Sequence, residues 1–140
     1  MRLNLGHLLL ISFLLAMQTS KKVVPIWFAE YDVEILNEPI IGDTIDYNKS
    51  NKEDFKFVFF DLRGKCYCER YINGKLYEKG NFDNSLDTLK RYVSGRSSNG
   101  RSSDTKVQEY FQPLKSGEWT IYKQKPVKEK YHLGVLTRSK

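Results

Sequence analysis

The stretch YINGKLYEKGNF, residues 71–82, decides the fold of this chain because an Asn-Gly pair separates two runs of strand-forming residues. Both central residues of a type I′ turn need a positive φ, and Asn and Gly adopt it more readily than other residues. Asn73 and Gly74 therefore predict a tight hairpin, with one strand ending near Tyr71 and the next running from Lys75 to Phe82.

The residues before this hairpin predict a meander. Apolar side chains alternate along residues 55–59, residues 61–64 have turn chemistry, and residues 65–71 run back as a strand. Residues 30–36 also alternate, with Tyr31, Val33 and Ile35 on one face and acidic residues on the other. We therefore expect three consecutive antiparallel strands and a half-buried strand ahead of them.

The remaining segments are less regular. Residues 37–54 are rich in loop-forming residues and predict a long loop with at most a short strand. Residues 83–93 suit either a short helix or a strand, and the neighbouring strands favour the strand. Residues 94–106 repeat Gly-Arg-Ser-Ser without an apolar anchor and predict a flexible hairpin loop. Further strands are expected at residues 107–111, 118–123 and 127–136, with a break at Gln112-Pro113 and a turn at Ser116-Gly117.

Length and composition predict one domain over residues 21–140, preceded by a signal peptide at residues 1–20. A chain of 140 residues that is 40% hydrophobic has material for a single core. Arg2 precedes a short uncharged apolar run, which a polar segment follows. We expect a mostly β protein with at most one short helix, exported to the periplasm, the outer envelope or the exterior. An uncleaved N-terminal membrane anchor is the alternative.

The excess positive charge lies at the C-terminal end. The formal net charge is +6, and residues 115–140 hold seven Lys or Arg residues against Glu118 and Glu129. A basic segment binds nucleic acid or an anionic surface by neutralising phosphates. Because an exported protein rarely meets nucleic acid, we interpret this segment as a solvated face and expect no nucleic acid partner. Contact with a membrane is a further expectation.

Residues 71–82, together with Leu114-Lys-Ser-Gly-Glu-Trp-Thr-Ile-Tyr122, resemble the bacterial variant of the MORN repeat. Its units join a Tyr-x-Asn-Gly-Lys hairpin, a Gly-aromatic step and a Gly-x-Trp-x-x-Tyr strand, matched here by Asn73, Gly74, Gly80, Phe82, Gly117, Trp119 and Tyr122. The similarity covers roughly residues 67–122, with residues 83–110 inserted. It implies hairpins stacked into a curled antiparallel single sheet, and a binding or scaffolding role. Some relatives carry an antitoxin label.

The cysteines are the sharpest chemical feature. On a strand, Cys66 and Cys68 point to the same face, where they suit a short-loop disulfide, two metal ligands or buried packing. A zinc site needs two more ligands, and beyond the signal segment His132 is the one histidine, so we expect no metal. A redox or structural disulfide is the alternative to plain burial.

Catalysis and cofactor binding find little support in the sequence. It lacks a Gly-x-Ser-x-Gly elbow, a His-Glu-x-x-His motif and a glycine-rich phosphate loop. Tyr67 and Tyr71 share a strand face opposite the cysteines and predict an aromatic patch. We expect a non-catalytic, cofactor-free module that binds a protein or envelope component through Tyr67, Tyr71, Trp119 and Tyr122. A thiol-disulfide exchange protein and an antitoxin-like partner are the alternatives.

Overall fold

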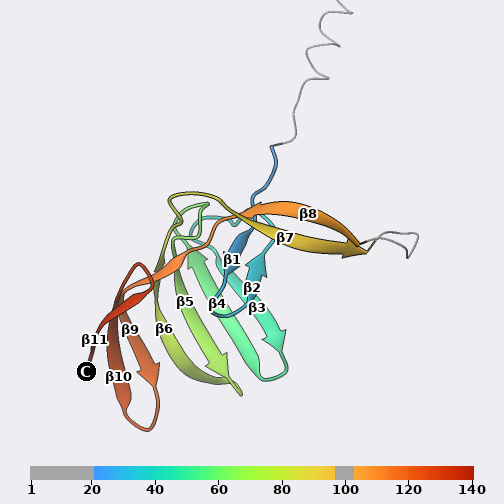
Figure 1. The fold of residues 1–140 in the computed structure, drawn as a ribbon. Coiled ribbons are helices and arrows are strands. Elements are labelled where there is room, and N and C mark those ends of the chain that lie inside the picture. Colours follow the sequence, from blue (N-terminus) through green and yellow to red (C-terminus); the bar gives the residue numbers. More distant parts are fainter. Residues whose placement is uncertain (1–20, 97–102) are drawn as a thin grey trace, which may run out of the picture.

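The computed structural model describes residues 21–96 and 103–140, and the regular structure of these residues is β-strand throughout (Figure 1). The main sheet has seven strands in the order β11-β10-β9-β6-β5-β4-β3, and every neighbouring pair is antiparallel. Its strands are β3 (Thr44–Ser50), β4 (Glu53–Phe59), β5 (Cys66–Ile72), β6 (Lys75–Asp83), β9 (Leu114–Tyr122), β10 (Pro126–His132) and β11 (Val135–Ser139). The predicted antiparallel meander is confirmed.

Two hairpins accompany this sheet. β1 (Ile26–Phe28) pairs with β2 (Val33–Ile35), and β7 (Leu89–Arg96) pairs with β8 (Ser103–Tyr110). The β7–β8 hairpin is inserted between β6 and β9 and projects from the sheet as an arm (Figure 1). β1 was not predicted from the sequence.

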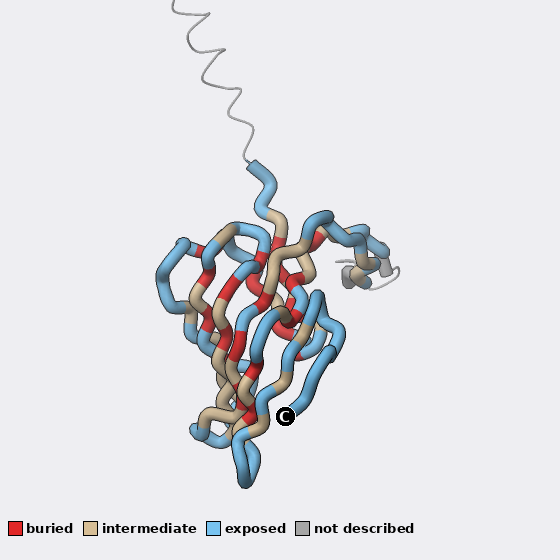
Figure 2. Tube along the Cα trace, turned by 90° about the vertical axis from the view of Figure 1, so that its left-hand side faces the viewer, coloured by how far each residue is buried: buried red, intermediate tan, exposed pale blue. Residues whose placement is uncertain are grey.

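The core lies between the β1–β2 hairpin and the inner face of the main sheet (Figure 2). The ring of Phe28 stacks on Phe57 with centroids 4.6 Å apart, and meets the edge of Phe82 at 4.9 Å. Phe55, Phe57 and Phe59 are all buried, as the alternation of β4 predicted. Aromatic side chains thus fill the space between the two layers, and the hairpin keeps water from this part of the sheet.

The turn that the sequence identified has the expected geometry. Asn73 has φ 51° and Gly74 has φ 73°, the positive values of a type I′ turn. The ambiguous segment 83–93 is also confirmed as strand rather than helix from Leu89 onwards, where it belongs to β7 (Leu89–Arg96). Tyr31, Val33 and Ile35 are buried on one face as predicted, although β2 itself is only three residues long.

Four predicted boundaries were wrong. Residues 44–50, expected in a long loop with at most a short strand, form the seven-residue edge strand β3 because they pair with β4. Ser116-Gly117 lies inside β9, where the register with β6 shifts, and is not a turn. The expected strand 127–136 is two strands, β10 and β11, joined at Leu133-Gly134. Within the expected flexible loop 94–106, residues 94–96 and 103–106 belong instead to β7 and β8, which remain paired as far as Arg96 and Ser103.

Two predictions fall outside the described residues. The signal peptide at residues 1–20 and the centre of the loop, residues 97–102, are not described. In the part of the chain that the structure does describe, no helix is long and apolar enough to span a bilayer.

Candidate functional site

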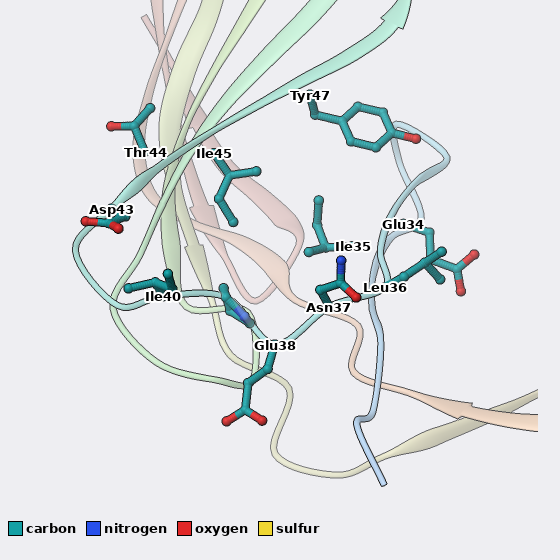
Figure 3. Close-up of a pocket in the computed structure, with 11 residues that line it drawn as sticks. Glu34, Ile35, Leu36, Asn37, Glu38, Ile40, Asp43, Thr44, Ile45 and Tyr47 are labelled. Atoms are coloured by element: carbon teal, nitrogen blue, oxygen red, sulfur yellow. The ribbon is translucent and has the colours of Figure 1, made fainter.

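A cleft of about 490 Å³ opens where the two layers part beside β3. One wall is the β2 end and the segment after it, and the other is the first half of β3 (Figure 3). Ile45 and Tyr47 of β3 stand opposite Ile35 and Leu36 in this view. The cleft is lined by Glu34, Ile35, Leu36, Asn37, Glu38, Pro39, Ile40, Asp43, Thr44, Ile45 and Tyr47.

Local chemistry explains why these side chains meet. Ile45 and Tyr47 alternate with the exposed Thr44, Asp46 and Asn48 along β3, so they point towards the hairpin layer. Leu36 and Ile40 are 63% and 68% exposed although both are large and apolar. An apolar hollow with exposed aliphatic walls is the usual form of a binding site for an apolar group.

The rim of the cleft is acidic. Glu34, Glu38 and Asp43 lie around its periphery (Figure 3). Glu34 is already paired, since Arg91 of the arm donates to it at 2.8 Å. Glu38 and Asp43 form no ion pair within the described residues. A ligand with a cation beside an apolar group therefore fits the cleft better than an anion.

β3 is an edge of the main sheet, paired with β4 alone among the described strands. The backbone N–H and C=O groups along its free side form a template for another extended strand. Because the cleft follows the first half of β3, a segment that adds to this edge would also place side chains in the cleft.

Three of the four predicted contact residues come together on the outer face of the main sheet. Tyr67 and Tyr71 donate their hydroxyl protons to Glu69, at 2.9 and 2.6 Å, and all three residues are half-buried. Tyr122 lies on the same side, with the Lys79 ammonium 5.9 Å from its ring centroid. These tyrosines lie on the outer face of the sheet and line none of the clefts described here.

The Glu69 carboxylate and the two phenols shift one another's pKa. The hydrogen bond from Tyr71 holds the pKa of Glu69 below its usual range. The same bond raises the pKa of Tyr71 to about 12. Burial, followed by its bond to Glu69, raises the pKa of Tyr67 as well. The tyrosines thus remain protonated donors and are unsuited to act as bases.

Trp119 is not available as a contact residue. Its side chain is 0% exposed and lies in the core, against Phe82 at 5.2 Å. Trp119 and Tyr122 are three residues apart, so the two-residue period of a strand places them on opposite faces. The expectation that both face a partner was therefore wrong for Trp119.

The cysteines are buried in the core. Cys66 and Cys68 are both free and 0% exposed, next to each other on the inner face of β5. Burial raises the pKa of both thiols well above the usual value. Because exchange requires an accessible thiolate, this position opposes the redox function considered for the pair. In the described residues no group of His, Cys, Asp and Glu is arranged to hold a metal ion.

An ionic network with two buried members, Glu78 and Lys115, joins the two layers next to the core. Lys115 of β9 donates to Glu78 of β6 at 2.9 Å and to Glu30 of the β1–β2 turn at 2.8 Å. Arg70 of β5 bonds both Glu78, at 2.9 Å, and Glu53, at 2.7 Å. We name the set Glu30, Glu53, Arg70, Glu78 and Lys115 the ionic lock, because it connects the hairpin to four strands of the sheet.

Aromatic rings surround the Lys115 ammonium. It lies 4.3 Å from the Trp119 ring centroid and 5.3 and 5.4 Å from those of Tyr131 and Tyr31. Burial by itself raises the pKa of Glu78, but the bonds from Lys115 and Arg70 outweigh it and hold the pKa below the usual range. Because both Glu30 and Glu78 are bonded to Lys115, this residue links the hairpin layer to the main sheet.

No local sequence pattern predicted the lock, and the cleft had a single weak signal. In the sequence, Glu38, Ile40 and Asp43 look like ordinary loop residues. They line the cleft only because the fold brings this segment next to β3. The weak signal for the cleft is the aliphatic pair Ile40 and Ile41, which is exposed in an otherwise polar segment, as is typical of a contact site.

No protein-family model matches this chain, and searches of curated proteins and of solved structures also gave no match. The similarity of residues 67–122 to MORN hairpins therefore stays a prediction.

Proposed function

We propose that this chain is a non-catalytic binding module that holds an extended segment of a partner protein in the cleft beside β3. The observation that carries the proposal is the coincidence of a free sheet edge with an apolar, acid-rimmed cleft. The partner strand pairs with β3 through its backbone, and alternate side chains enter the cleft. This role agrees with the binding or scaffolding function that the MORN resemblance implies.

The chemistry of the cleft specifies the segment. A fully buried Leu or Ile side chain contributes about 1.5–3 kcal/mol, so one apolar residue supplies most of the side-chain affinity. Glu38 and Asp43 favour Lys or Arg on either side of that residue. We therefore expect a short segment in which a basic residue flanks an aliphatic one.

As part of the proposal, we expect this partner in the cell envelope or outside the cell, because the apolar run within residues 1–20 is typical of an export signal. An antitoxin-like role would use the same cleft on a cytoplasmic partner. Recovery of the mature protein without residues 1–20 from the exported fraction would separate the two locations.

Selection from a library of random linear peptides tests the cleft. We expect the selected peptides to carry an aliphatic residue next to Lys or Arg, and to shift the amide resonances of β3 and of residues 35–43. The double variant Glu38→Lys, Asp43→Lys should lose this binding by at least roughly tenfold, since each reversal turns attraction into repulsion. Both side chains are exposed, so the variant should fold normally.

Asp46→Lys is the matched control. Asp46 belongs to the same strand but lies on its outer side, away from the cleft. It should leave peptide binding unchanged. Selected peptides that bind the double variant as tightly as the unchanged protein, or that shift resonances elsewhere, would contradict the proposal.

A further inference from the structure

The last two strands carry a row of cations on their outer face. Lys128 and Lys130 are exposed and alternate with half-buried residues along β10. Lys130 is directly opposite Arg138 of β11, and the backbone of Lys128 bonds that of Lys140 in both directions, at 2.8 and 3.1 Å. We name these four residues the basic strip. Together with Glu118 and Glu129 they line a hollow of about 300 Å³.

The charge of the basic strip is only partly compensated. Glu118 accepts a bond from Lys128 at 2.7 Å, and both side chains are exposed. Within the described residues, Lys130, Arg138 and Lys140 form no ion pair. Glu129 accepts a hydrogen bond from the Tyr131 hydroxyl at 2.6 Å. Like charges directly opposite each other on neighbouring strands destabilise a sheet, so an anion bound here would relieve the repulsion.

The turn at the end of the basic strip is apolar. Val135 is opposite His132, which places it on the face that carries the strip, and it is 66% exposed. Leu133 is 44% exposed and has φ 46°, a conformation that Asn or Gly adopts more readily than Leu. We name Leu133 and Val135 the apolar tip. An exposed Leu in a left-handed turn position is unfavourable for folding alone, which points to a role in binding.

We propose that the basic strip and the apolar tip dock this protein on the surface of an anionic lipid bilayer. The strip faces lipid phosphates, and the tip enters the boundary between headgroups and acyl chains. Weak surface attraction and shallow apolar insertion together give stable peripheral binding where either alone does not. A soluble polyanion would use the cations but has no apolar region for Leu133, so the combination favours a membrane.

This site is separate from the peptide cleft. The strip lies on the β9–β10–β11 side of the main sheet, and the cleft lies beside β3, the opposite edge. Docking through the strip therefore leaves the cleft accessible, and the two proposals succeed or fail independently.

Co-sedimentation with lipid vesicles tests the proposal. The full chain is mixed with vesicles of phosphatidylglycerol and phosphatidylcholine, and with vesicles of phosphatidylcholine alone. Residues 1–20 are common to all variants, so binding to the neutral vesicles serves as the reference for their contribution. We expect the unchanged protein to bind the anionic vesicles more tightly, and added salt to weaken this difference.

Two variants separate the contributions. Lys130→Gln with Arg138→Gln should lower the anionic partition coefficient by on the order of tenfold, because each basic residue near the surface contributes. Leu133→Asn should lower it several-fold while preserving the turn, because Asn suits the positive φ. Neither variant should melt at a lower temperature than the unchanged protein. Lys75→Gln with Lys106→Gln, which removes the same charge elsewhere, should bind as the unchanged protein does.

Equal binding to neutral and anionic vesicles would overturn the proposal. So would full binding by Leu133→Asn combined with complete competition by inorganic polyphosphate, since the strip would then be a site for a soluble polyanion.

Discussion

Gly80 and Trp119 show at the scale of single residues how β6 and β9 are held next to each other. A Cβ atom at position 80 would lie 2.2 Å from the indole ring, so the ring is in direct contact with the glycine backbone. The indole N–H donates to the carbonyl of Asn81 at 3.0 Å, which satisfies its one polar group inside the core. The glycine is therefore required by the position of the tryptophan.

Gly80→Ala should destabilise the protein because the added methyl group has no space. Overpacking of this kind costs about 1–3 kcal/mol, and here the obstacle is a rigid ring. Unfolding in urea should show this decrease in the free energy of unfolding. Asn81→Ala, at the exposed neighbouring position, is the control and should change it little. An unchanged midpoint for Gly80→Ala would contradict the packing described.

The buried thiols should be unreactive in the folded protein. Cys66 and Cys68 are inaccessible, and burial raises the pKa of each thiol, so little thiolate forms at neutral pH. Labelling with a thiol reagent at pH 7 should be at least about a hundredfold slower than in guanidinium chloride. Rapid labelling of the folded protein would restore thiol exchange as a candidate function.

At the scale of elements, local chemistry determined which parts of the fold could be predicted. The β5–β6 hairpin was predictable because Asn73-Gly74 specifies its turn within two residues. The β10–β11 turn was not predictable, because Leu is not a typical turn residue. The positive φ of Leu133 is seen only in the structure. β3 was hidden for a different reason, since its polar composition resembles a loop and its strand form depends on pairing with β4.

The candidate site was predictable only in part. The two-residue period correctly put Tyr67 and Tyr71 on the face opposite the cysteines, because it needs nothing beyond the strand itself. The cleft depends on how residues 36–43 return towards β3, and no local pattern encodes that return. Its acidic rim is therefore a property of the tertiary fold.

The β7–β8 arm depends on a small anchor at its base. Arg91 donates to Glu34 at 2.8 Å and lies 4.8 Å from the Trp27 ring centroid, while Tyr92 further along is 79% exposed. A two-stranded hairpin is only marginally stable without such packing.

Arg91→Ala should therefore loosen the arm without unfolding the sheet. We expect amide hydrogen exchange in β7 and β8 to become at least roughly tenfold faster, with exchange in β4 and β5 unchanged. Lys90→Ala, on the exposed side of the same strand, should leave the exchange rates in both places unaltered. Equal acceleration in the main sheet would show that the arm is part of the same cooperative unit.

At the scale of the whole molecule, the two proposed surfaces lie on opposite sides of one sheet. β11 carries the end of the basic strip, and β3 borders the cleft. If the β10–β11 end is held on a membrane, as proposed, the β3 edge at the other end of the sheet stays open to a partner. The continuous meander between them gives a fixed separation, which suits a scaffolding role better than a loose linker would.

The ionic lock makes the stability of the whole fold depend on pH. The pKa of Glu78 is lowered in the folded protein, so folding favours its charged form. This contribution is fully present above the unfolded pKa, near 4.5, and is lost as the pH falls through the lower folded pKa. Glu69, with its pKa also lowered, adds a change of the same sign.

Glu78→Gln tests this link between the lock and global stability. At pH 7 the variant should be less stable by about 3 kcal/mol, because the charge of the nearly buried Lys115 is left without its buried partner. Below pH 4.5 its urea midpoint should fall less steeply than that of the unchanged protein, since the proton-linked group is gone. Glu78→Leu combined with Lys115→Met should recover much of the lost stability, because it removes both buried charges and fills similar space. If Glu78→Gln were as stable as the unchanged protein at pH 7 and both acid profiles were parallel, the hairpin would be held by the aromatic core alone and the lock would make no net contribution. A double variant as unstable as Glu78→Gln would contradict the expectation that the loss comes from an unpaired buried charge.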